Sequence, residues 1–170
     1  MGQEVTQAEV LISLLVRFPQ IAAVHYEPQG RLLRLIFVLE TVQPEDFQLF
    51  TDRFKAHLKA FHHLKNNAEY HLSWEKQKNQ KFSVLEIRRD VSSLSLEELN
   101  LITELVLDYH GPSLLQEGSA VDEEDQFEHN VLIESGLSLG LISGQEKLTG
   151  FRENGRVLVF STSLTGVSQV

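Results

Sequence analysis

The segment from Arg31 to Glu40 limits most strongly what this chain can fold into. It reads Arg-Leu-Leu-Arg-Leu-Ile-Phe-Val-Leu-Glu and contains the longest run of large apolar residues in the sequence. Alternate residues of a strand point to opposite faces of a sheet. One face would carry Leu33, Leu35, Phe37 and Leu39, and the other would carry Leu32, Ile36 and Val38. This pattern predicts a central strand that is buried on both faces.

The residues before this strand predict a helix and a second strand. Thr6 and Glu9 have the spacing of a capping box, which predicts a helix that begins at Gln7. A strand is expected at 21–27, and the Pro28-Gln29-Gly30 turn would join it to the central strand as a hairpin. The central strand therefore has a predicted antiparallel neighbour.

The residues after the central strand predict an amphipathic helix. Pro44 suits the first helical position, and acidic residues follow it where the helix dipole favours them. A stripe of apolar residues then runs to about Leu64 at spacings of three and four. We interpret the stripe as a buried helix face rather than a ligand-binding wall; its members are Phe47, Phe50, Phe54, Leu58 and Phe61.

The remaining elements follow from capping, alternation and turn signals. Strict alternation predicts a strand at 70–75 with one wet face, and 81–89 is predicted as a strand with two apolar faces. A second capping box at Ser95 and Glu98 predicts a helix that ends at Gly111-Pro112. The Glu153-Asn154-Gly155 turn predicts a C-terminal hairpin.

An acidic helix is expected between these last two elements. Asp122 can cap it, and its packing residues are expected to be Phe127, Val131 and either Leu132 or Ile133. Three glycines, Gly136, Gly140 and Gly144, are expected to loosen the chain that follows.

From Arg31 onward, the order strand, helix, strand, strand, helix, strand predicts an α+β fold of the ferredoxin-like plait type. The prediction includes an extra N-terminal helix and strand, an acidic helical insertion and a C-terminal hairpin. A different α+β arrangement remains the alternative. Residues 1–162 are expected to form a single α+β domain, and 163–170 a disordered tail, because these last residues are small and polar.

The absence of cysteine excludes disulfides, thiol catalysis and cysteine-ligated zinc. It also favours a reducing, cytoplasmic location. The apolar segment 10–16 follows acidic residues and is too short to span a bilayer, so we expect neither secretion nor membrane insertion.

The charges are strongly segregated within a chain of formal net charge -9. The span 53–89 has nine basic residues and three acidic ones, whereas 90–146 has thirteen acidic residues and no lysine or arginine. The interaction candidates are Lys55, Lys59, Lys76, Lys78, Arg88, Asp122, Glu123 and Glu124. Two arrangements stay open: the acidic helix packs beside the lysines and neutralises them, or the two regions lie apart and leave a basic patch free.

Two groups of residues are candidate metal ligands. His57, His62 and His71 lie close in sequence, but their spacing does not place two ligands one helical turn apart, and Lys55 and Lys59 would repel a cation. In the acidic helix, Glu124 and Glu128 share a face, with His129 beside them. The helix dipole explains most of this acidity without a ligand.

The chain lacks a glycine-rich phosphate loop, a Gly-x-Ser-x-Gly elbow and a His-Glu-x-x-His pair. We therefore expect no cofactor, no catalytic residue and no metal, and we lean against an enzyme.

The basic span makes nucleic acid a candidate ligand. The residues 36–39, Ile-Phe-Val-Leu, resemble the first-strand motif of RNA-recognition domains, which share the plait fold. The predicted strand at 81–87 lacks the glycines and paired aromatics of the companion motif, and the net charge is adverse. RNA binding through the basic 53–89 region is therefore an alternative rather than the first expectation.

The opening helix and strand, together with 150–160, Gly-Phe-Arg-Glu-Asn-Gly-Arg-Val-Leu-Val-Phe, resemble conserved, uncharacterised small α+β proteins of Gram-positive bacteria. The resemblance implies a bacterial, cytoplasmic setting and brings no functional residues.

The expected function is a non-catalytic interaction or regulatory module that self-associates as a homodimer or binds another protein. A plait sheet with helices on one face leaves its other face in need of a cover. The alternatives are the RNA-associated module and a small metal-binding protein or enzyme that uses the histidine cluster.

Overall fold

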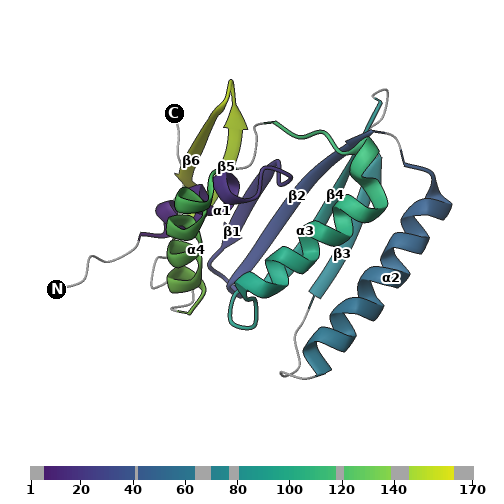
Figure 1. Cartoon of the computed structure of the whole chain (residues 1–170), viewed down its shortest axis with the longest axis horizontal. Helices are drawn as coiled ribbons and strands as arrows, with labels where there is room; N and C mark the ends of the chain where they lie inside the picture. The colour runs from purple at the N-terminus through teal and green to yellow at the C-terminus, as the bar shows by residue number, and fades with distance from the viewer. Residues whose placement is uncertain are drawn as a thin grey trace.

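The chain folds into one antiparallel sheet with helices packed against it (Figure 1). The computed structural model describes residues 6–40, 42–63, 70–76, 81–117, 121–138 and 146–162. In chain order the elements are α1 (Gln7–Arg17), β1 (Ala23–Glu27), β2 (Leu32–Glu40), α2 (Pro44–His63), β3 (Tyr70–Lys76), β4 (Phe82–Asp90), α3 (Leu96–His110), a 3-10 turn (Gly111–Ser113), α4 (Glu123–Ser138), β5 (Lys147–Glu153) and β6 (Arg156–Thr162). The α+β class is therefore confirmed.

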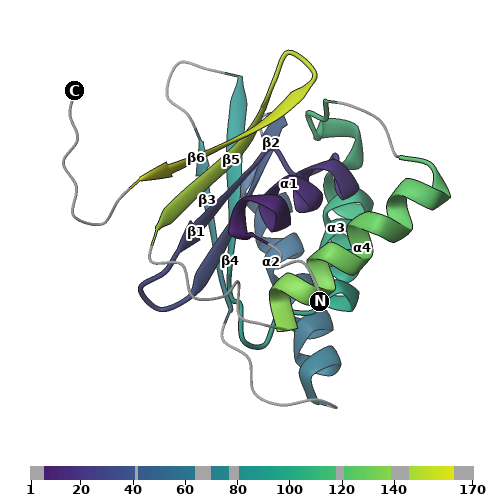
Figure 2. The ribbon, with the colours of Figure 1, turned by 90° about the vertical axis from the view of Figure 1, so that its left-hand side faces the viewer.

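The six strands lie in the order β3-β4-β2-β1-β5-β6, and each pairs antiparallel with its neighbours. The four helices lie on one face of this sheet, and the opposite face carries none of the described helices (Figure 2). We call the helix-covered side the inner face and the other side the outer face.

The strand order differs from the predicted plait at one place. The part β2-β4-β3, with α2 and α3 as its connecting helices, follows the plait, but β1 rather than a C-terminal strand lies beside β2. The tight turn before β2 explains the difference, since Gly30 adopts φ 84° and Arg31 φ 51°. Sequential strands joined by such a turn pair with each other, so the C-terminal hairpin pairs with β1 instead.

The inner face holds the main core. The four alternate residues of β2 from Leu33 to Leu39 have no exposed surface, and neither do Phe50, Phe54 and Leu58 of α2. The buried apolar stripe of α2 is thus confirmed at these three positions, while Phe47 is partly buried against the same core. Burial of β2 on both faces is wrong, because its outer-face residues remain half-exposed.

The helix α4 packs on α1 rather than on the sheet. Of its predicted packing positions, Ile133 is confirmed, whereas Phe127 and Val131 are wrong. Phe127 and Val131 are 68% and 47% exposed, whereas Ile133, Gly136 and Leu137 are buried. A Cβ atom at Gly136 would lie only 2.4 Å from a methyl group of Val10 in α1. Gly136 therefore does not loosen the chain but permits close helix packing, and the helix continues to Ser138.

Of the local signals at the element ends, the first capping box, the N-cap at Ser95 and the C-terminal turn are confirmed, whereas the Glu98 carboxylate bonds to Arg89 and does not complete the second box. Thr6 and Glu9 form the reciprocal capping box of α1, and the Ser95 hydroxyl accepts a hydrogen bond from the Glu98 backbone N–H at the start of α3. At the C-terminal hairpin, Asn154 and Gly155 both adopt positive φ, as a two-residue turn requires.

Candidate interaction surface

None of the described helices covers the outer face of the sheet (Figure 2). Register places its residues in rows that cross several strands. One row runs through Glu86, Ile36, Ala23, Phe151 and Leu158, and the next runs through Arg88, Arg34, His25, Thr149 and Phe160. The face is therefore apolar towards the β5–β6 end and charged towards β4.

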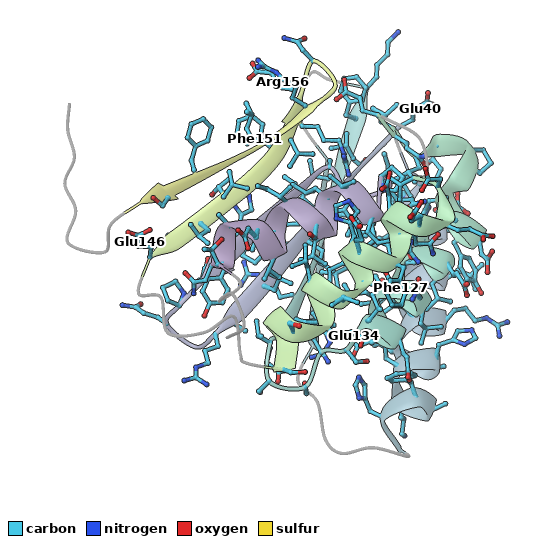
Figure 3. The ribbon with its side chains drawn as sticks, turned by 60° about the vertical axis from the view of Figure 1, so that its left-hand side comes forward. Glu40, Phe127, Glu134, Glu146, Phe151 and Arg156 are labelled. Atoms are coloured by element: carbon cyan, nitrogen blue, oxygen red, sulfur yellow. The ribbon has the colours of Figure 1, made fainter. Side chains whose placement is uncertain are left out.

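The apolar end is built by the C-terminal hairpin. Phe151 and Phe160 stack with ring centroids 5.5 Å apart and planes 22° from parallel. Leu158 lies directly across from Phe151 in the register. Phe160 is 57% exposed, and Figure 3 shows Phe151 on the side of the hairpin that points away from the helices. We call Phe151, Leu158 and Phe160 the hairpin patch.

The charged end is neutralised within the protein. Arg34 donates to Glu86 Oε1 from Nε at 2.9 Å and from Nη2 at 2.6 Å, and from Nη1 to Glu27 at 3.2 Å. Arg88 donates to the other Glu86 oxygen. Burial alone would raise the pKa of Glu86, but the hydrogen bonds from Arg34 and Arg88 lower it, while the bond to Glu86 raises the pKa of Arg34. Arg88 is thus already paired.

His25 joins this network to the hairpin. Its Nδ1 lies 3.0 Å from the Thr149 hydroxyl of β5. Burial, followed by the charge of Arg34, lowers the pKa of His25, so the neutral ring is favoured. The centre of the outer face is consequently a hydrogen-bonded surface without a free cation at His25.

A second charged cluster lies on the inner face, where β4 meets α3. Arg89 and Glu98 have fully buried side chains, and Arg89 donates to both Glu98 oxygens, from Nη2 at 2.6 Å and from Nε. Arg89 also donates to Asp90 at 2.6 Å. His62 Nε2 lies 2.8 Å from Glu98 Oε1. The cluster ties the sheet to α2 and α3.

Asp90 extends this cluster to the solvent side. Burial alone would raise the pKa of Asp90, but hydrogen bonds from Ser93 and Ser92 and the charge of Arg89 lower it to about 2. Ser93 donates both its backbone N–H and its hydroxyl to the carboxylate. The turn before α3 is therefore fixed by an ionised Asp90.

The histidine candidates are not brought together in the described part of the chain. His57 is exposed on α2, and His62 points to Glu98. His71 lies in β3, where side chains are outside the description. Among the described residues no three potential ligands form a metal-binding group.

The ligand candidates of α4 also diverge. Glu124 and Glu128 are exposed, whereas His129 turns inward, with its Nδ1 3.1 Å from the Ser13 hydroxyl of α1. Asp122 caps the helix by accepting a hydrogen bond from the Asp125 backbone N–H at 2.9 Å. Glu123 and Glu124 are exposed in the first turn. This acidic end is explained by helix capping and the dipole.

The basic helix α2 and the acidic helix α4 lie apart. The helix α4 packs on α1, and α2 lies on the far side of α3 (Figure 1). Lys55 and Lys59 are exposed on α2. Lys76 belongs to β3, and Lys78 lies outside the described residues. Of the two arrangements considered, the structure has the separated one for α2 and α4.

A groove of about 420 Å³ at one end of the sheet had no signal in the sequence. Its lining includes Pro19, Val38, Leu115 and Arg152. Arg152 donates to the backbone carbonyls of Phe18 at 3.0 Å and Ile21 at 3.2 Å, and to that of Leu15. Its Nε and Nη2 groups thus hold the C-terminal end of α1, and burial lowers the pKa of Arg152.

The hairpin patch was also missed, although the sequence contained a signal for it. A two-residue Asn154-Gly155 turn pairs residues whose numbers add to 309, which places Phe151 opposite Leu158 and Thr149 opposite Phe160.

Within the described ranges, none of the helices is long and apolar enough to cross a bilayer. No family model, curated protein or solved structure matches the chain.

Proposed function

We propose that this chain is a non-catalytic interaction module that self-associates through the hairpin patch on the outer face of its sheet. The observation that carries the proposal is the exposed Phe160, stacked on the partly buried Phe151, on a sheet face that no described helix covers. The lack of cysteine is consistent with a reducing cytoplasm as its location.

The electrostatics of the outer face support a protein partner over a charged ligand. Arg34, Arg88, Glu27 and Glu86 satisfy one another, so this face offers no free cation among them. A neutralised surface next to an exposed aromatic group has the anatomy of a protein interface, with an apolar centre and a polar rim.

The energy available from the patch limits the strength of the association. Phe160 is 57% exposed, and a buried Phe removes roughly 150 to 250 Å² from water. At about 25 cal/mol per Å², full burial of Phe160 would contribute about 2 to 3 kcal/mol per copy. Association costs at least about 4 kcal/mol of lost motional freedom, so the patch alone supports only weak binding.

Sedimentation velocity from about 1 to 100 μM tests the proposal. We expect a concentration-dependent change from the 19.4 kDa monomer to a dimer. Phe160→Ser should shift the change to higher concentration. Leu49→Ser is the matched control, because Leu49 is 49% exposed on α2 and distant from the hairpin (Figure 1). A wild-type monomer throughout this range would refute the proposal.

RNA binding remains a second candidate because Lys55 and Lys59 are exposed on α2 and α4 does not cover them. Two observations weaken it: Phe37, the aromatic residue of the RNA-like segment, is buried in the core, and Arg88 is paired with Glu86. Binding of single-stranded RNA by the wild type and by Lys55→Ala/Lys59→Ala, at low and moderate salt, distinguishes the candidates. Tight binding at moderate salt that is lost in the variant would rank RNA first.

A further inference from the structure

The strand β6 forms one end of the sheet, and its backbone is incompletely paired. It pairs with β5, and no strand in the described ranges pairs on its other side. In this hairpin Glu153 and Arg156 close the two-residue turn as a hydrogen-bonded pair, and such pairs recur at every second residue. Leu158 and Phe160 therefore bond to β5, and the backbone groups of Val157, Val159 and Ser161 point to the free edge.

This edge lacks the features that normally prevent strands from pairing between molecules. Arg156 is its only charged residue and lies at the turn; from Val157 the strand reads Val-Leu-Val-Phe-Ser-Thr. Protein edges are usually protected by lysine, proline or a bulge. An unprotected edge rich in β-branched and aromatic residues is instead suited to accept another strand.

We infer that β6 pairs antiparallel with β6 of a second copy, around a two-fold axis that passes between the two copies of Val159. This inference rests on the proposed self-association and names the contact that produces it. Residue numbers of paired positions then add to 318, so Val159 meets Val159 and Val157 meets Ser161. These are the residues whose backbone groups face the free edge, which makes the register compatible with a hydrogen-bonded ladder.

The charges and side chains of β6 are self-complementary in this register. Arg156 lies opposite Thr162 of the second copy, so no charged residue of the strand faces a like charge. Leu158 lies opposite Phe160 of the second copy in a non-hydrogen-bonded pair, where facing side chains approach most closely. Both residues lie on the outer face, so the two hairpin patches would form one apolar surface across the axis.

The combination of backbone and side-chain contacts overcomes the limit set by the patch alone. Shifting the axis to Val157 or Ser161 keeps the hydrogen-bonding pattern but shortens the paired segment within 156–162. The Val159 axis pairs this whole strand and also joins the exposed aromatic residues. A second copy is therefore the partner that the edge and the patch fit together.

Cross-linking tests the register directly, because the chain has no native cysteine. Leu158→Cys and Phe160→Cys proteins are prepared separately and oxidised alone and as an equimolar mixture, at concentrations where sedimentation shows that the reduced variants are dimeric. We expect efficient disulfide formation in the mixture and at least fivefold less in either protein alone. A mixture of Leu158→Cys with Leu49→Cys is the matched control and should remain uncross-linked.

Backbone blocking supplies an independent test. Ser161→Pro removes an N–H that points to the free edge, and edge strands tolerate such a proline. We expect the dimer dissociation constant to rise at least tenfold with little change in the unfolding midpoint of the monomer. Ser161→Ala, which keeps the N–H, should dimerise like the wild type.

The outcomes separate the two proposals. A wild-type dimer that gives no cross-link between positions 158 and 160, or that is unaffected by Ser161→Pro, would overturn edge pairing and leave self-association through another contact. A wild-type monomer at all concentrations would overturn both. Cross-linking in the mixture together with loss of the dimer in Ser161→Pro would support both.

Discussion

Gly136 of α4 packs closely against Val10 of α1. We expect Gly136→Ala to destabilise the protein when residue 10 is valine and to stabilise it when residue 10 is alanine. In an isolated helix, Gly→Ala stabilises by about 1 kcal/mol. Here the new Cβ would lie 2.4 and 2.8 Å from the two methyl groups of Val10. Val10 is 1% exposed, and a β-branched side chain in a helix has essentially one rotamer, so these methyl groups cannot swing away.

The cost of this overlap should exceed the gain in helix propensity. Overpacking of a core contact costs about 1 to 3 kcal/mol, so Gly136→Ala should reduce the free energy of unfolding by about 1 kcal/mol net. Val10→Ala removes both methyl groups and should itself destabilise by about 2 kcal/mol through lost packing. In that background the methyl group introduced by Gly136→Ala has room, and the same substitution should instead stabilise by about 1 kcal/mol.

The assay is urea unfolding of the four proteins of this double-mutant cycle at one fixed protein concentration, since association would otherwise affect stability. The expected coupling energy is about 2 kcal/mol. Gly111→Ala is a control for overlap alone, because a Cβ at Gly111 meets no atom within 4 Å; its effect should not depend on Val10→Ala. If Gly136→Ala stabilised the wild type, the close packing of α1 and α4 would be refuted.

Three further predictions concern the core and its buried charges. Phe54→Ala should lower the free energy of unfolding by about 3 to 5 kcal/mol, because Phe54 has no exposed surface; an unchanged urea midpoint would contradict its place in the core. Glu98→Gln should cost about 3 kcal/mol, since it removes the buried carboxylate that accepts two hydrogen bonds from Arg89, although Asp90 still pairs with Arg89; a wild-type unfolding curve would show that the pair is not buried. In the folded state the pKa of Asp90 is lowered from 3.8 to about 2. Ionised Asp90 therefore contributes about 1 to 2 kcal/mol to the free energy of unfolding, a value reduced for its partial exposure. This contribution is present above pH 4 and is lost as the pH falls from about 4 to about 2. Asp90→Asn should therefore flatten the acid limb of the stability profile, and an unaltered limb would contradict the shift.

Exposed neighbours provide the controls for these variants. Leu49→Ala removes an apolar side chain from the same helix as Phe54, but Leu49 is 49% exposed, and the substitution should cost less than about 1 kcal/mol. Glu97→Gln adjoins Glu98 in the first turn of α3, where loss of a favourable dipole interaction costs about 0.3 to 1 kcal/mol.

The elements that depend on neighbouring residues could be predicted from the sequence. The capping box at Thr6, the N-cap at Ser95 and the Asn154-Gly155 turn are local hydrogen-bonding and backbone requirements, and each lies where it was expected. The reciprocal half of the Ser95 box is replaced, because the Glu98 carboxylate accepts from Arg89 of β4. The buried stripe around Phe54 also follows from local periodicity. The strand order depends instead on which strand pairs with the second edge of β2. The tight turn between β1 and β2 places β1 there, and not a C-terminal strand.

The orientation of α4 could not be read from hydrophobicity, because its closest contact uses a residue without a side chain. Gly136 faces α1, and Phe127 and Val131 consequently face outward. For the candidate site, the register of the C-terminal hairpin follows from its turn and shows which residues share a face. The position of Phe151 and Phe160 beside a free edge follows only from the order of strands in the sheet. The buried Arg89–Glu98 pair likewise requires β4 and α3 to be placed together.

The hydrogen bonds from Arg152 to the end of α1 mean that α1 and β1 can complete their contacts only after Arg152 has been synthesised. The carbonyls that Arg152 holds belong to Leu15, Phe18 and Ile21, which lie 137, 134 and 131 residues earlier. The neighbouring strand β1 pairs with β5 across a similar separation. During synthesis, part of the apolar surface of α1 and β1 therefore stays exposed until the C-terminal hairpin has left the ribosome. A chain released before that hairpin would expose its N-terminal segment to chaperones, and closure of this long loop should set the folding rate.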